Sequence, residues 1–204
     1  GLGDVYKRQL LYHVERMNEE SANALLKVME EPPEGVLFLL TADSLASVLP
    51  TIRSRCVSFA VAPVSPADCT RYCAAQGVDK KTAALYSELF DGHIGTVLAA
   101  ARDEARAAQV EKALELARAA AARDSYTAAV LLAAYEKDKA AAAALLTDFR
   151  AVAAAGLRSS PRAPVQGTQA RQAVRLADAA LQRLGAQVNP KVVLSVFAAK
   201  LRTL

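Results

Sequence analysis

The sequence has few aromatic residues and no tryptophan, which limits the kinds of core it can build. Aromatic side chains make up 5% of the 204 residues, and alanine supplies much of the hydrophobic content of 53%. This composition favours packed helices over a β-sandwich. We find no signal peptide and no apolar run of membrane-spanning length. We therefore expect a soluble cytoplasmic protein with no membrane partner.

Cysteine and histidine are also scarce. Three cysteines, Cys56, Cys69 and Cys73, have no framework spacing, so we expect reduced thiols. Cys69 and Cys73 are four residues apart and would share a helix face, where two buried thiols are expected rather than a metal site. The two histidines, His13 and His93, stand apart in the sequence and are expected to be structural. The sequence therefore predicts no metal ligands.

A glycine-rich phosphate loop of the G-x-x-x-x-G-K-[ST] kind does not occur in the chain. A magnesium–nucleotide site would also need an Asp-Glu pair at a strand end. The region where it would stand, His13-Val14-Glu15, has a single carboxylate. We expect that this chain binds no cofactor and holds no complete active site.

Residues 10–61 alternate between strand-like and helix-like patterns. A strand is expected at residues 10–14, a helix after the N-cap Asn18 that ends at Pro32-Pro33, and a buried strand at Val36–Leu40. A short helix follows. The alternating residues Val57, Phe59 and Val61 predict a third strand. This order indicates a parallel α/β sheet, too small to be a complete one.

The remainder of the chain is predicted to be helical. Pro63, Ser65 and Pro66 mark a linker and a helix start, and three short helices are expected before residue 103. Helix N-caps are expected at Ser65, Asp79, Asp124, Asp138 and Asn189. The alanine-rich pattern then continues to the C-terminus, interrupted by a loop at residues 159–164, and indicates a helical bundle. Residues 150–204 carry nine basic side chains against Asp178 alone. That segment could face nucleic acid or an acidic partner, or form a solvated face.

The segment Pro50-Thr51-Ile52-Arg53-Ser54-Arg55-Cys56 places two guanidinium groups between two predicted strands. Residues two apart do not share a helix face, so only one of these arginines is expected to point at a given partner. An arginine here could present a planar fork to a phosphate. It could equally be a surface arginine paired with a nearby carboxylate.

Four segments together resemble the clamp-loader branch of the AAA+ ATPases. They are Asn23-Ala24-Leu25-Leu26-Lys27, Glu30-Glu31-Pro32-Pro33, Leu37-Phe38-Leu39-Leu40-Thr41 and the segment from Pro50 to Cys56. Within that branch the chain looks most like the delta-prime family of bacterial DNA polymerase III subunits. The resemblance covers residues 16–61, and the first strands and phosphate loop of that family have no counterpart in this sequence.

The resemblance implies a domain order: an α/β part of an AAA+ domain at residues 1–62, an all-α lid at 63–103 and an all-α collar at 104–204. It also implies a role in a clamp loader, which places a sliding clamp on primed DNA. The partners would be the gamma/tau and delta subunits, the clamp and the DNA. Gly95 stands where hydrolysing relatives have a sensor arginine, which fits a subunit that does not hydrolyse ATP.

The resemblance also assigns roles to individual residues. Arg55, within the motif Ser54-Arg55-Cys56, corresponds to an arginine finger that enters the ATP–magnesium site of the neighbouring subunit. Thr41 corresponds to the first sensor residue. Thr51 and Arg53 are candidates for DNA contact. Two alternatives remain: a fragment of an ATP-hydrolysing gamma/tau-type subunit, and a purely helical scaffold.

Overall fold

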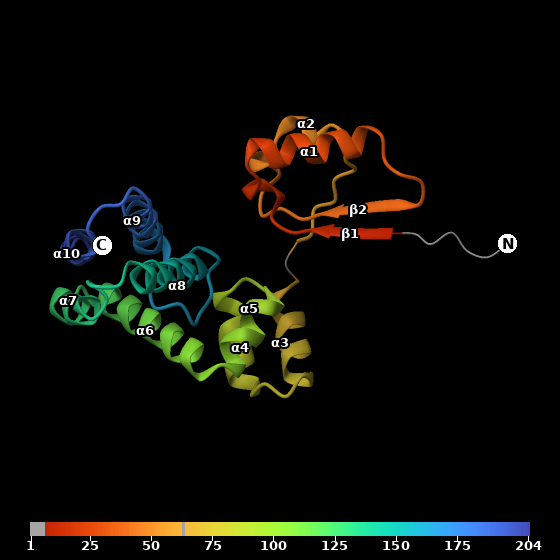
Figure 1. The fold of residues 1–204 in the computed structure, drawn as a ribbon. Coiled ribbons are helices and arrows are strands. Elements are labelled where there is room, and N and C mark those ends of the chain that lie inside the picture. Colours follow the sequence, from red (N-terminus) through yellow and green to blue (C-terminus); the bar gives the residue numbers. More distant parts are fainter. Residues whose placement is uncertain (1–6, 63) are drawn as a thin grey trace. The chain divides into compact units, whose positions relative to one another are not determined.

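A computed structural model of the chain describes residues 7–62 and 64–204. The chain divides into two compact units, Gly1–Val61 and Ala62–Leu204 (Figure 1). The first six residues and Pro63, which was predicted to mark the linker, lie outside the described residues. We describe the two units separately.

The first unit is built around two parallel strands, β1 (Lys7–Leu11) and β2 (Val36–Leu40), paired from Lys7 with Val36 to Leu11 with Leu40. A parallel pair needs a crossover connection. Here the chain crosses over through a 3₁₀ turn (Val14–Arg16) and helix α1 (Glu19–Glu30). Figure 1 shows α1 and the single turn of α2 (Pro50–Arg53) on the same side of the strands. The expected parallel α/β arrangement is confirmed.

Local sequence signals account for α1. The side chain of Asn18 accepts a hydrogen bond from the backbone N–H of Ser21 at 2.8 Å, as an N-cap does. Glu19 and Glu20 lie in the first turn, where the helix dipole favours acids. One face of the helix then buries Ala22 and Leu25. These two side chains join a small core with Val14, Val48 and Ile52.

Two strand predictions for this unit were wrong. The first strand was expected at residues 10–14, but β1 ends at Leu11 because His13 turns into the left-handed region, at φ 55°. Val57, Phe59 and Val61 form no strand, and they are 81%, 85% and 94% exposed. Alternation reports which side chains share a face, but a strand also needs a neighbour for its backbone groups, and no described strand pairs with this segment.

The second unit begins with three short helices, α3 (Pro66–Ala75), α4 (Lys80–Leu89) and α5 (Ile94–Arg102). The predicted caps are confirmed: Ser65 accepts from the Asp68 N–H at 3.1 Å, and Asp79 accepts from the Thr82 N–H at 2.9 Å. Cys69 and Cys73 are fully buried with their sulfurs 4.0 Å apart, as expected for core thiols.

Five further helices follow in the same unit: α6 (Glu104–Ala121), α7 (Ser125–Ala133), α8 (Lys139–Leu157), α9 (Gly167–Gly185) and α10 (Pro190–Leu201). The mainly helical fold is therefore confirmed. Helix α8 packs against both α6 and α9 (Figure 1). It buries Leu145, Leu146, Phe149 and Val152 in the core. Small alanines on the facing helices allow this close packing.

Helix α8 corrects one expectation about composition. By length and composition it is apolar enough to cross a membrane, although we expected no such run. Half of its most apolar stretch is buried inside the unit. A core helix in a bundle shows this same pattern, because it is apolar on several faces.

The polar contacts of the second unit link its early and late helices. Asp148 on α8 accepts hydrogen bonds from both terminal nitrogens of Arg106 and from Gln109, both on α6. The loop at residues 159–164 packs against the short helices, since Ser160 is buried and donates to Glu88 at 2.5 Å. Residues 62–204 thus form one compact unit. Its division into a lid at 63–103 and a collar at 104–204 stays a prediction.

Candidate functional site

The motif from Pro50 to Cys56 forms one helical turn followed by a tight turn. Pro50 begins α2 at its first position, where a missing N–H costs nothing. The backbone N–H groups of Ser54 and Arg55 donate to the carbonyls of Pro50 and Ile52. Ile52 is 1% exposed and anchors the turn in the small core. Its neighbours Arg53, Ser54 and Arg55 are therefore left on the exposed side.

Arg55 is held at the surface by two groups of its own unit. Its Nη2 lies 2.5 Å from Oε1 of Glu30, the last residue of α1, and its Nη1 donates to the carbonyl of Thr51 at 3.1 Å. The side chains of Arg55 and Glu30 are 37% and 51% exposed. An ion pair this open to water contributes about 0–1 kcal/mol. The guanidinium is therefore oriented by its neighbours but not locked to them.

The other motif residues have distinct surroundings. Ser54 Oγ donates to the Thr51 carbonyl at 3.0 Å, which closes the turn beneath Arg55. Burial raises the pKa of the Cys56 thiol, so this partly buried cysteine is a poor nucleophile. The Arg53 side chain is exposed and makes no ion pair within residues 7–62 and 64–204. It is available for an external anion.

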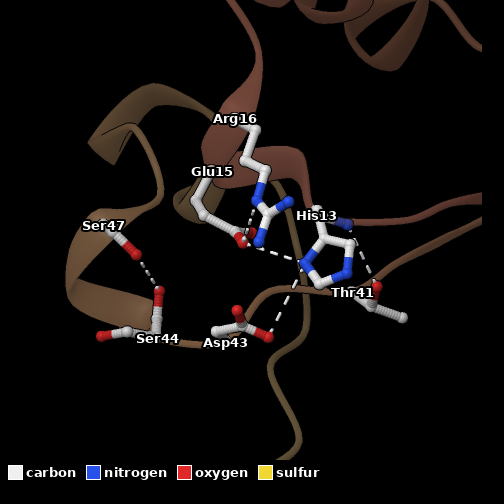
Figure 2. A network of polar contacts seen from close by, with 7 residues as sticks. All are labelled: His13, Glu15, Arg16, Thr41, Asp43, Ser44 and Ser47. Carbon is white, nitrogen blue, oxygen red and sulfur yellow. Dashed lines mark hydrogen bonds and ion pairs between the residues drawn. The ribbon is translucent and has the colours of Figure 1, made fainter. Parts of the chain in front are cut away.

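Thr41 lies in a different polar network, at the carboxyl end of β2. Its Oγ1 accepts a hydrogen bond from the His13 backbone N–H at 3.3 Å, and its carbonyl accepts from the Val14 N–H at 3.0 Å (Figure 2). Within the part of the chain that the structure describes, no hydrogen bond connects Thr41 to residues 50–56. The sensor-like residue thus contacts the end of β1 rather than the arginine motif.

Two features of this region were missed in the sequence. Glu30 lies 25 residues before Arg55, and nothing in the spacing indicates that they meet. The side chains of His13, Glu15 and Asp43 converge where the two strands end, and they could hold a metal ion (Figure 2). A signal for this cluster existed, because the carboxyl ends of parallel strands lie at the same sheet edge.

The basic C-terminal segment is partly neutralised. Arg150, Arg158, Arg162 and Lys191 lie in ion pairs with carboxylates of the same unit. Arg171, Arg175 and Arg183 on α9 are exposed. The segment therefore offers a smaller free charge than the sequence count indicates, and its role as a binding surface stays a prediction.

Comparison with known proteins finds a likeness to a known family in residues 3–65. A family model described as "DNA polymerase III, delta subunit" matches those residues. The chain is 45% identical over 62 residues to the DNA polymerase III subunit delta' of Yersinia pestis, a match that covers 30% of this chain and 18% of that protein. It is 62% identical over 42 residues to the delta' subunit of Haemophilus influenzae, which covers 21% and 13%.

Gamma subunits match over the same part. The chain is 38% identical over 63 residues to the DNA polymerase III subunit gamma of Buchnera aphidicola, covering 31% of this chain and 17% of that protein. Each of these matches therefore spans less than a fifth of the relative. The crystal structure of a gamma subunit-related protein from Thermotoga maritima has a similar fold, with a TM-score of 0.54 at 22% identity. That likeness covers 98% of this chain and 74% of the other. Through residues 3–65 the chain is therefore similar to subunits of DNA polymerase III, as the resemblance in the sequence indicated.

Proposed function

We propose that this chain is part of a delta-prime-type subunit of a bacterial clamp loader, and that it supplies Arg55 to the ATP site of a neighbouring subunit. The observation that carries the proposal is the presentation of Arg55. Its guanidinium is oriented by Glu30 and the Thr51 carbonyl, yet it stays more than one-third exposed. A cation that completes another subunit's site needs both properties, a fixed direction and access from outside.

The chemistry of the proposed role is electrostatic. Charge on a transferring γ-phosphoryl group is stabilised by a cation that reaches it from outside the nucleotide's own pocket. The planar guanidinium can donate two parallel hydrogen bonds to phosphate oxygens. The pair with Glu30 is weak enough to be exchanged for a phosphate at little cost. ATP and magnesium would then belong to the neighbour, and this chain would contribute only the arginine.

The proposed subunit does not hydrolyse ATP itself. At the end of β1 the side chain of Glu15 faces His13, and no second carboxylate follows directly in the chain. The identity to the Haemophilus delta' subunit, 62% over 42 residues, exceeds the 38% to the Buchnera gamma subunit and the 44% to the Escherichia coli tau subunit. Both observations support a delta-prime-type subunit over a hydrolysing gamma/tau-type one.

The partners of the proposed subunit follow from the same role. They are the gamma/tau and delta subunits, the sliding clamp reached through the assembly, and primed DNA, all in the cytoplasm. The helices of residues 104–204 would form the collar that holds the subunits together. Thr51 and Arg53 are exposed beside Arg55 and would be able to contact the DNA backbone.

The proposal is tested in a clamp loader reconstituted with the full-length protein and its partner subunits. We expect Arg55→Ala to slow hydrolysis at the adjoining ATP site by ~10³-fold, the scale of arginine fingers, with a smaller loss for the whole assembly. Arg55→Lys should recover little, because lysine lacks the planar fork. Lys27→Ala removes an exposed charge from α1 and serves as the control.

Arg53→Ala separates the DNA role from the finger role. We expect it to weaken the stimulation by primed DNA and to leave the DNA-independent ATPase intact. Full DNA-stimulated ATPase in the assembly with Arg55→Ala would refute the finger role. An ATP-hydrolysing activity of the separate full-length subunit would favour the gamma/tau-type alternative instead.

A further inference from the structure

The side chains of His13, Glu15 and Asp43 converge at the carboxyl ends of β1 and β2 (Figure 2). His13 Nδ1 lies 3.2 Å from Oε1 of Glu15 and 3.6 Å from Oδ1 of Asp43. All three potential ligand atoms lie within 4.8 Å of one another. We propose that this cluster is a binding site for a single divalent transition-metal ion, with zinc as the best match.

The spacing of the ligand atoms fits a tetrahedral ion. Zinc binds imidazole nitrogen and carboxylate oxygen at about 2.0–2.2 Å, so two ligands of one tetrahedral ion lie about 3.3–3.6 Å apart. Of the two distances from His13 Nδ1, 3.6 Å to Asp43 lies within that range and 3.2 Å to Glu15 lies just below it. The third distance joins the carboxylate oxygens of Glu15 and Asp43. The Asp43 side chain is 71% exposed and can rotate to bring its oxygen to the distance that a tetrahedral ion requires. Three protein ligands would leave the fourth position to water.

The surroundings of Glu15 give a second, independent indication that this cluster binds a cation. Its side chain is only 10% exposed, and Figure 2 shows its carboxylate directed toward the His13 ring. Oε1 faces that ring, but Oε2 is buried and has no hydrogen-bond partner among the residues that the structure describes. A buried carboxylate oxygen left unpaired carries a desolvation penalty that a bound cation would remove. Apart from His13, Arg16 also pairs with this carboxylate, and its Nε lies 3.9 Å from Oε1, within ion-pair range but beyond hydrogen-bond distance.

The ligand types select the class of metal. One imidazole and two carboxylates suit zinc and neighbouring first-row ions, whereas magnesium and calcium prefer all-oxygen sites. The two carboxylates balance the charge of a divalent ion. The backbone holds the imidazole in place, since His13 donates its N–H to Thr41 Oγ1 and adopts φ 55° and ψ 52°. Histidine is among the residues that tolerate this region.

The inference departs from the sequence-based expectation that the chain holds no metal, and it does not rest on the proposed function. The test is a titration of the full chain with Zn²⁺ alone, in which calorimetry measures the binding of the ion. We expect one equivalent to bind, and binding should weaken as the pH falls, because protonated imidazole cannot ligate. Mg²⁺ at the same concentration should not compete.

Three variants locate the ion. We expect His13→Ala and Glu15→Gln to weaken binding at least ~100-fold, because even groups that only support a ligand contribute 10–100-fold. Asp43→Asn should have a smaller effect, since Asp43 is largely exposed. His93→Ala and Glu20→Gln are the matched controls and should bind as the unaltered chain does. Glu15→Gln preserves the volume of the side chain, and circular dichroism confirms the fold of each variant.

Cobalt gives a second readout that distinguishes the ligands. Co²⁺ at a tetrahedral nitrogen–oxygen site shows visible absorption but lacks the intense thiolate bands that Cys56, Cys69 or Cys73 would produce. Thiolate bands, or Zn²⁺ affinity that is unchanged in both His13→Ala and Glu15→Gln, would overturn the assignment. So would the absence of Zn²⁺ binding to the unaltered chain, which would leave a histidine flanked by two carboxylates as an ion-pair network only.

Discussion

The polar cluster formed by Asp148, Arg106 and Gln109 sets a strong expectation for the stability of the second unit. The Asp148 side chain is 5% exposed and accepts three hydrogen bonds, two from Arg106 and one from Gln109 at 2.8 Å. The hydrogen bond to Asp148 raises the pKa of Arg106, so the guanidinium keeps its positive charge. Asp148→Ala would leave the Arg106 charge without its partner between α6 and α8.

The size of the effect follows from the burial of the two partners. Removing one member of a buried ion pair costs about 3–5 kcal/mol. Arg106 is 26% exposed and can recover some hydration, so we expect Asp148→Ala to lower the free energy of unfolding by about 2–4 kcal/mol. Asp148→Asn keeps the shape and one acceptor oxygen, and should lose about 1–2 kcal/mol.

Denaturant unfolding measures these differences. The reactivity of Cys69 and Cys73 reports on the second unit, because both thiols are fully buried in the same core as Phe149. In the native state burial and the neighbouring Cys69 raise the pKa of Cys73 to about 11, which keeps its labelling slow. Asp178→Ala is the control, since Asp178 pairs with Arg150 across two helices but is 50% exposed. We expect that control to lose at most about 1 kcal/mol. If Asp148→Ala unfolds within about 0.5 kcal/mol of the unaltered chain, the cluster does not stabilise the bundle as argued.

Two further predictions concern single carboxylates. Glu30→Gln should change the free energy of unfolding by less than about 1 kcal/mol, because Glu30 and its partner Arg55 are both exposed. The same variant should slow Arg55-dependent ATP hydrolysis in the clamp loader two- to fivefold, because the guanidinium is then less firmly oriented. Glu31→Gln is the matched control, and equal rates for the two variants would exclude an orienting role for Glu30. Hydrogen bonds from the Thr127 hydroxyl and backbone lower the pKa of the N-cap Asp124. The ionised carboxylate therefore makes its full contribution to the free energy of unfolding above about pH 5, and this contribution is lost as the pH falls through the lowered pKa. Asp124→Asn should match the unaltered chain at pH 7 and unfold less steeply with acid, as followed by circular dichroism; identical acid curves would contradict this reasoning.

The helix starts were predictable because their signals are local. A cap and its partner lie within three residues of each other, so residue type and position suffice. Each of the predicted caps accepts a backbone hydrogen bond at a helix start: Asn18, Ser65, Asp79, Asp124, Asp138 and Asn189. A boundary between lid and collar was expected after residue 103, but an N-cap at Asp103, which ends α5 and caps α6, was not predicted within a stretch without glycine or proline. At that position the aspartate is the only residue that indicates a helix start.

The contacts that define the candidate sites were less accessible to sequence reasoning. The motif from Pro50 to Cys56 carried the resemblance to clamp-loader subunits, but the Glu30 partner of Arg55 depends on how α1 ends beside α2. His13 was expected to be structural because no ligand-type spacing surrounds it. Asp43 comes close to it only through the parallel register of β1 and β2, which ends at Leu11 and Leu40. Pairing between distant segments is decided by tertiary packing, which residue spacing does not encode.

The segment that carries Val57, Phe59 and Val61 has a practical consequence for work on the first unit. Three large apolar side chains on one extended stretch, with unpaired backbone donors and acceptors, form a template to which a second polypeptide can add as a strand. A preparation of that unit alone is therefore prone to aggregate. A lysine in place of Phe59 would act as a gatekeeper against such association.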